Sequence, residues 1–146
     1  VANHSYWNLD GSPTYAGHTL RLAADRYLPT RPDFTPQGPV LPVEGTAMDL
    51  RQGVRLQAGV PAFDTCFCLA DTPRDLTEVL WLTGASGVGM AVATTAPGLQ
   101  VYDARDARRP GGGPHEGLAI EAQLWPDAPA NPAYPSIMLG PGQVWE

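Results

Sequence analysis

The sequence predicts an all-β fold, an antiparallel β-sandwich, and three observations support this prediction. Apolar runs are short, and turn residues separate them at regular intervals, as in sandwiches and barrels. Glycine and proline number 16 each among 146 residues, which is frequent but below the share typical of low-complexity chains. The best helix candidate, residues 20–28, begins with the alternation Leu-Arg-Leu of a strand. Length and composition fit one domain.

The order of the elements follows from the same pattern. Prolines at 29, 32, 36 and 39 predict an extended loop after the first apolar segment. Gly84-Ala85-Ser86-Gly87 lies between two apolar runs and predicts a hairpin turn. Residues 103–116, rich in glycine and arginine, are expected to form a mobile loop. Strands are expected at residues 40–43, 54–56, 63–69, 79–82, 89–95, 99–102 and 118–125.

Charge excludes two classes of partner. The formal net charge is −6 and the pI about 4.9, and all nine basic residues are arginines. Because there is no basic stripe, we expect no nucleic-acid partner, and an anionic membrane surface would repel the chain. No apolar stretch reaches the length of a bilayer span.

Cysteine usage indicates a reducing compartment. Cys66 and Cys68 are two apart, so in a strand they share one face and are poorly placed for a disulfide. We expect them to be small buried apolar groups, and two thiols with three scattered histidines predict no metal site. A cytoplasmic location follows. A secreted or periplasmic one stays open, because the sequence begins at Val1 and reads as a piece of a longer protein.

His4 and Glu121 are the candidate acid and base. His4 lies in residues 3–9 (NHSYWNL) and Glu121 in an apolar run at 118–125, and such a pair suffices for general acid–base chemistry. Strand alternation turns Glu121 away from Ile120 and Ala122, which keeps the carboxylate ionised. Tyr6 and Trp7 are interpreted as core residues.

Several segments, in order, resemble the aldose 1-epimerases (mutarotases). Residues 3–9 resemble the family's N-H-S/T-Y-F/W-N-L segment, and 45–51 (GTAMDLR) its G-T-x-x-D-x-R element. Residues 63–67 (FDTCF) resemble F/Y-D-H-x-F, and 97–102 (PGLQVY) resemble P-G-L/V-Q-x-Y. Residues 121–142 resemble the family's C-terminal E-x-Q, P-D-x-x-N and L-x-P-G run.

The resemblance implies a fold, an activity and a site. The fold is part of a galactose-mutarotase-like supersandwich, and the reaction interconverts the α and β anomers of free aldohexoses of the glucose or galactose type without a cofactor. By resemblance, His4 is the general acid, Glu121 the general base, and Asp64 binds sugar hydroxyls. Gln100 is a further candidate for the sugar hydroxyls, with a polar strand-end residue as the alternative. His18 is interpreted as structural and His115 as a loop-surface residue, while Asp127 and Asn131 are expected to fix a turn.

The chain departs from the family in two ways. Thr65 stands where the family usually has histidine. Family members are also about twice as long, so residues 1–146 correspond to the C-terminal half, and the arginine and second histidine of the N-terminal half have no counterpart here. We therefore expect the chain to pair with a second copy or with that other half, because half a sandwich leaves sheet edges uncovered.

Two alternatives remain open. One is a non-catalytic carbohydrate-binding remnant. The other is a relative of the hexose-6-phosphate epimerases. That branch needs basic residues for the phosphate, and this chain has none beside its motifs, since the cluster Arg105, Arg108 and Arg109 lies in the expected loop.

Overall fold

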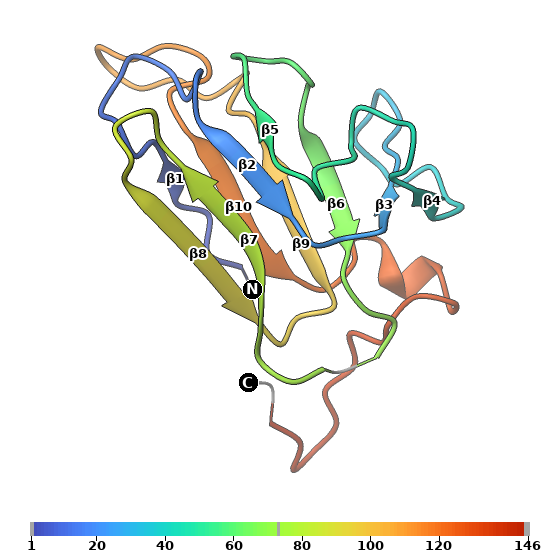
Figure 1. The fold of residues 1–146 in the computed structure, drawn as a ribbon. Coiled ribbons are helices and arrows are strands. Elements are labelled where there is room, and N and C mark those ends of the chain that lie inside the picture. Colours follow the sequence, from blue (N-terminus) through green and yellow to red (C-terminus); the bar gives the residue numbers. More distant parts are fainter. Residues whose placement is uncertain (1, 73, 145–146) are drawn as a thin grey trace.

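Two antiparallel β-sheets form a sandwich in the computed structural model, which describes residues 2–72 and 74–144 (Figure 1). The four-stranded sheet lies in front of the six-stranded sheet in this view. The smaller sheet has the order β5 (Val54–Arg55), β2 (Thr19–Leu22), β7 (Thr77–Thr83), β8 (Gly89–Thr94). The larger sheet has the order β1 (Tyr6–Trp7), β10 (Leu118–Gln123), β9 (Gly98–Tyr102), β6 (Asp64–Cys68), β3 (Arg26–Leu28), β4 (Leu41–Pro42). The all-β prediction is confirmed.

The expected strands form, most of them slightly shorter than predicted. The segment 20–28, which carried the best helix pattern, forms β2 from Leu20 on and then β3. In β2 buried leucines alternate with exposed polar residues, which is the pattern of a strand. The predicted hairpin is β7–β8. Asp10 caps its turn, since the carboxylate accepts from the backbone N–H groups of Ala85 (2.8 Å) and Ser86 (3.0 Å). The only helix in the described part of the chain is a single 3-10 turn, Ala128–Ala130.

The hydrophobic core fills the space between the two sheets. Alternate residues of β6, β9 and β10 point into it, among them Phe67, Leu99, Val101, Leu118 and Ile120. Burying each such side chain stabilises the fold by roughly 1.5–3 kcal/mol. Thr65 belongs to this inner face, where its hydroxyl contacts the sulfur of Met48. The substitution of the family's histidine at this position therefore lies on the side of β6 away from Asp64.

The outer face of the six-stranded sheet carries the polar residues. Register places Tyr6, Ala119, Tyr102 and Asp64 in one row across β1, β10, β9 and β6. The adjacent row holds Glu121, Gln100, Cys66 and Leu28. Because residues of one row share a face, both rows face away from the core between the sheets. Leu28 and Cys66, at one end of the second row, are buried in a smaller apolar cluster with Cys68 and Trp125.

Two loops border that face, residues 29–40 between β3 and β4 and residues 103–117 between β9 and β10. Buried Asp103 anchors the second loop, since its carboxylate accepts from the Phe63 N–H (3.1 Å) and the Arg105 Nε–H (2.9 Å). His115 also anchors it: Nδ1 lies 2.8 Å from the Asp103 carbonyl oxygen, and the ring packs edge-on against Tyr15. The expectation of a surface histidine is wrong, because these contacts half-bury the ring.

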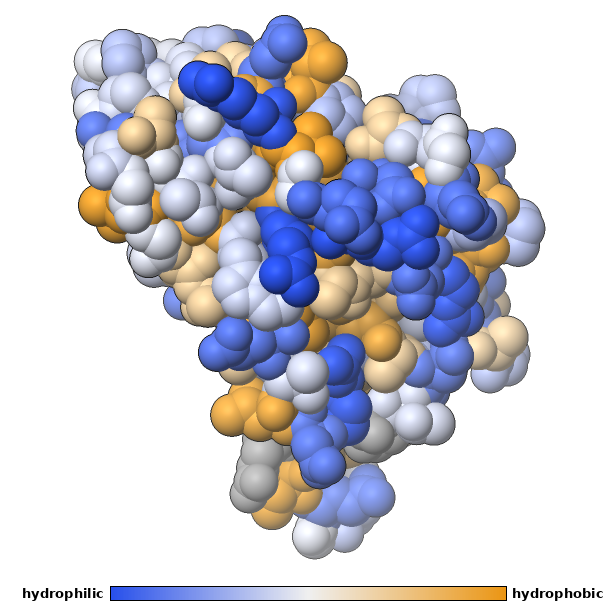
Figure 2. Space-filling model, in the orientation of Figure 1, coloured by the Kyte–Doolittle hydropathy of each residue, from blue (hydrophilic) through white to orange (hydrophobic). Residues whose placement is uncertain are grey.

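The opposite face, on the four-stranded sheet, is of mixed polarity. Figure 2 shows hydrophilic and hydrophobic residues interspersed there. Arg21 covers one aromatic residue of this face, with Cζ 4.1 Å from the centroid of the Trp81 ring. Within the described residues, no helix is long and apolar enough to cross a membrane.

Candidate active site

His4 and Glu121 meet on the outer face of the six-stranded sheet. Nε2 of His4 lies 3.4 Å from Oε1 of Glu121. The Glu121 side chain is 10% exposed and that of His4 53% exposed, so the carboxylate lies inside the site and the imidazole at its rim. Ile120 lies in the core on the other face of β10, as strand alternation predicts for the base.

The surroundings of Glu121 raise the pKa of its carboxyl above the ordinary value of 4.5. Burial is the main cause, because it removes water from the charged form. His4 acts in the opposite direction, and Asp64 adds a further upward push. A carboxylate whose pKa lies closer to neutral accepts a proton more readily than an ordinary surface glutamate does.

Asp64 and Gln100 form a hydrogen-bonded pair beside this acid–base pair. The Gln100 Nε2–H donates to Oδ1 of Asp64 at 2.8 Å. This contact gives Asp64, which begins β6, the partner that a half-buried aspartate requires. Oε1 of Gln100 is buried without a hydrogen-bond partner among the described residues. Gln100 also stands directly opposite Glu121 in the sheet, on the strand between those of Glu121 and Asp64.

A cavity of about 260 Å³ brings three of the four candidate residues together. Its lining is made by His4, Phe34, Asp64, Tyr102, Asp106 and Glu121. Gln100 does not line it and reaches it through Asp64. Sequence reasoning missed Tyr102, although alternation from Gln100 places it on the same face. It also missed Phe34 and Asp106, which come from loops where no local pattern marks a site.

Tyr6, in the segment 3–9 that also carries His4, lies near this cavity, contrary to its interpretation as a core residue. Tyr6 is 46% exposed and Trp7 37% exposed, so neither is a core residue. The Tyr6 ring centroid lies 5.2 Å from that of His4 and 6.4 Å from that of Tyr102. The interpretation as core fails for Tyr6 because its row faces away from the core. For Trp7 it fails because β1 is an edge strand of two residues with a neighbouring strand on one side only.

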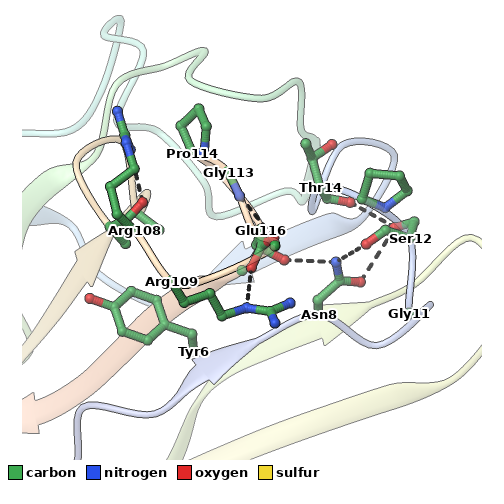
Figure 3. Close-up of a pocket in the computed structure, with 15 residues that line it drawn as sticks. Tyr6, Asn8, Gly11, Ser12, Thr14, Arg108, Arg109, Gly113, Pro114 and Glu116 are labelled. Carbon is green, nitrogen blue, oxygen red and sulfur yellow. Dashed lines mark hydrogen bonds and ion pairs between the residues drawn. The ribbon is translucent and has the colours of Figure 1, made fainter.

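A larger cavity of about 1130 Å³ adjoins the site at Tyr6 (Figure 3). Its polar side chains bind one another. The Asn8 amide donates to the Glu116 carbonyl oxygen at 2.7 Å, and the Glu116 carboxylate accepts from Arg109 Nε at 2.7 Å. These contacts hold the loop 103–117 against residues 3–9. The smaller cavity is the candidate site, because the candidate acid and base lie side by side there.

The remaining histidine and the cysteines have structural surroundings. His18 is fully buried and accepts the Leu9 N–H at Nε2 (2.9 Å), as expected of a structural residue. Cys66 and Cys68 are free and buried, and burial raises the pKa of both thiols, that of Cys68 to about 12. The turn expected at Asp127 and Asn131 is present, with Asn131 Nδ2 donating to the Asp127 carbonyl oxygen at 2.9 Å. Across residues 2–72 and 74–144, no cluster of three or more His, Cys, Asp or Glu could hold a metal ion.

Comparison with known proteins decides the family. A family model described as aldose 1-epimerase matches residues 1–146. The chain belongs to the aldose 1-epimerase family. Galactose mutarotase of Rattus norvegicus is 38% identical over 159 residues, covering 99% of this chain and 46% of the relative. Galactose mutarotase of Homo sapiens is 36% identical (100% and 47%), and aldose 1-epimerase of Escherichia coli is 30% identical (99% and 47%).

Solved structures of aldose 1-epimerase relatives share this fold. An aldose epimerase homologue from C. elegans superimposes with a TM-score of 0.87 at 27% identity, over 97% of this chain and 47% of that one. Galactose 1-epimerase from Lactobacillus acidophilus gives a TM-score of 0.67 at 25% identity, over 84% and 39%. The chain thus spans about half the length of the curated relatives it matches.

Proposed function

We propose that the protein acts as an aldose 1-epimerase, with His4 as general acid and Glu121 as general base. The observation that carries this proposal is the 3.4 Å between His4 Nε2 and Glu121 Oε1 at one cavity. Anomerisation acts on the C1 hydroxyl and the ring oxygen, which are bonded to the same carbon. An acid and a base that serve them together must therefore lie side by side.

The proposed reaction opens and closes the sugar ring. Glu121 removes the proton of the C1 hydroxyl, C1 and its oxygen form a carbonyl group, the bond between C1 and the ring oxygen breaks, and His4 protonates that oxygen. After rotation about the C1–C2 bond, the reverse proton transfers close the ring on the other face of the carbonyl. Each general catalyst accelerates such a step by roughly 10²–10⁴-fold, and no cofactor takes part in the proposal.

Asp64 and Gln100 are proposed to hold the substrate, a free aldohexose of the glucose or galactose type. The Asp64 carboxylate lines the cavity, where it would accept hydrogen bonds from the sugar hydroxyls. Gln100 fixes its orientation through the 2.8 Å hydrogen bond to Oδ1. Because both groups lie one row away from Glu121 or directly opposite it, a sugar bound to Asp64 has its C1 end within reach of the base.

We propose that this chain alone turns over more slowly than its longer relatives. The His4 side chain is half-exposed, so water competes with substrate at the acid. By resemblance, the N-terminal half of the domain supplies an arginine and a second histidine to the pocket. Correct positioning of groups is worth roughly 7–11 kcal/mol in favourable cases. A partner, either that half or a second copy, would complete the site.

Sugar binding without catalysis is the second candidate function, and the open rim of the site favours it. A hexose-6-phosphate substrate has less support, since Arg105 pairs with Asp103 and Arg109 with Glu116. The free thiols Cys66 and Cys68 support the proposed cytoplasmic location.

Polarimetry of freshly dissolved α-D-galactose and α-D-glucose tests the two candidates. An epimerase accelerates the drift of optical rotation in proportion to protein concentration. Sugar-dependent shifts of the His4 imidazole resonances, without acceleration, would support binding alone. Neither acceleration nor binding would contradict both functions.

A further inference from the structure

The loop between β3 and β4 places an aromatic ring at the cavity. Phe34 lines it together with His4 and Glu121 and is 58% exposed. The chain has three phenylalanines, and the other two, Phe63 and Phe67, are fully buried in the core. Phe34 is therefore the phenylalanine whose ring is available to a ligand.

Hydrogen bonds within the loop hold Phe34 in position. The Arg31 N–H donates to the Thr35 carbonyl oxygen (2.8 Å), and the Phe34 N–H donates to the Arg31 carbonyl oxygen (2.9 Å). The Asp33 carboxylate accepts from the N–H and hydroxyl of Thr35, at 3.1 and 2.6 Å. The Arg31 guanidinium donates to the Pro36 carbonyl oxygen at 2.8 Å. The polar side chains around Phe34 thus bind the turn itself, and its ring faces the cavity.

The backbone at Phe34 is in an unfavourable conformation. Its φ of 65° lies in the left-handed region, which favours glycine and is costly for a bulky side chain. Burial would offset such a cost, but a ring that is 58% exposed gains little from burial. A strained backbone conformation whose cost is not offset by side-chain burial is typical of ligand-binding sites.

We propose that Phe34 is a substrate-positioning residue whose ring stacks against the C–H face of a galactose-type pyranose. The proposal rests on the epimerase function above and deepens it. Asp64, Glu121 and His4 supply polar contacts for hydroxyls, whereas an aromatic face attracts polarised C–H groups. In D-galactose the hydrogens on C3, C4 and C5 share one face of the ring. In D-glucose the hydrogen on C4 lies on the opposite face, so Phe34 favours galactose.

An aromatic contact also suits the reaction. The C3–C5 part of the sugar must stay in place while the C1–C2 bond rotates in the open form. Stacking holds that part without a directional hydrogen bond, and it leaves the C1 end free to turn beside Glu121 and His4.

Kinetics of Phe34→Gly and Phe34→Tyr test the role. Glycine accepts the positive φ, so Phe34→Gly removes the ring without lowering the thermal midpoint. We expect its KM for galactose to rise about 3- to 10-fold, the range of an aromatic contact, with kcat within about twofold. The KM for glucose should rise less. Phe34→Tyr, which keeps an aromatic ring, should keep the wild-type KM for galactose. An unchanged KM for galactose in Phe34→Gly would overturn the proposal.

Fluorine NMR gives a readout that is independent of turnover. Protein labelled with 4-fluorophenylalanine has one signal from each of the three phenylalanines, and Phe34→Gly identifies the signal of Phe34. We expect galactose to shift this signal and leave the other two in place, while sorbitol, which has no ring, shifts none. A stationary Phe34 signal beside shifted His4 resonances would overturn this inference and leave the epimerase function intact. If neither responds and polarimetry shows no acceleration, the proposed function itself fails, and the inference with it.

Discussion

Glu121→Gln is the substitution that tests the proposed chemistry most directly. The amide keeps the shape of the side chain, which is 10% exposed and 3.4 Å from His4 Nε2, but it cannot accept the C1 proton. Ile120 lies on the opposite face of β10, so the change leaves the core contacts in place. The variant should fold like the wild type and lose the base.

The size of the loss follows from the contribution of the base. General base catalysis contributes roughly 10²–10⁴-fold, which corresponds to about 3–5 kcal/mol of activation free energy. We therefore expect the rate to fall by about two orders of magnitude or more.

The dependence of the rate on pH provides a second signature of the base. Because burial raises the pKa of Glu121, the wild-type rate should fall as the pH decreases through that raised pKa. Well below this pKa the rate should fall by about tenfold for each pH unit. The free energy of unfolding should change in the opposite direction and increase as the pH falls. A carboxyl whose pKa is higher in the folded than in the unfolded state contributes stability at low pH, which is lost as the pH rises through the folded-state value.

Polarimetry on α-D-galactose between roughly pH 5 and 8, with thermal melts on the same samples, measures both effects. Glu121→Gln should lose the acid limb of the profile together with the rate, and its thermal midpoint at neutral pH should equal or exceed that of the wild type. Glu44→Gln, at an exposed loop position, is the matched control and should leave both unchanged. A Glu121→Gln rate within tenfold of the wild type would refute the assignment of the base.

Three further predictions follow from the same structure. His4→Asn should reduce the anomerisation rate nearly as much as Glu121→Gln, roughly 10²-fold or more by polarimetry, since ring-oxygen protonation then falls to water. Asp64→Asn should mainly raise KM, by roughly tenfold, because its carboxylate makes charge-assisted hydrogen bonds of about 1.5–3 kcal/mol to hydroxyls. The wild-type chain should associate at micromolar concentration in light scattering, because β8 is an edge strand of six residues that can pair with another chain; Ala91→Lys, at an exposed position of that strand, should reduce the association.

Each of these predictions has a contrary outcome. Wild-type anomerisation by His4→Asn would remove the acid from the proposal. A large fall in kcat for Asp64→Asn, with KM unchanged, would assign Asp64 to proton transfer. A monodisperse monomer of the wild-type chain at micromolar concentration would show that the β8 edge does not drive association.

Strand alternation made most of the sheet predictable from sequence. In β9 and β10 it separates Val101 and Ile120, which lie in the core, from Gln100 and Glu121 on the other face. The helical pattern at 20–28 failed because packing between the sheets buries every second residue of β2, Leu20 and Leu22, and overrides local propensity.

The site was less predictable from sequence where loops and edges build it. His4 precedes the two-residue strand β1, so its position came from the family resemblance and not from periodicity. Phe34 and Asp106 reach the cavity from separate loops, and such placement depends on long-range packing that no local pattern records. Tyr6 was wrongly interpreted as a core residue because the sequence pattern of an edge strand with apolar residues resembles that of a core strand.

The alternation of faces along β6, β9 and β10 has a consequence for how this protein can diversify. Phe67, Leu99 and Ile120 pack in the core, whereas Asp64, Gln100 and Glu121, on the same three strands, face the candidate site. Substitutions in one set leave the other in place as long as the register holds, so substrate preference can drift without a loss of stability. An insertion of one residue within any of these strands does the opposite. Beyond the insertion, each side chain moves to the opposite face of the strand, so the core and the candidate site are disrupted together.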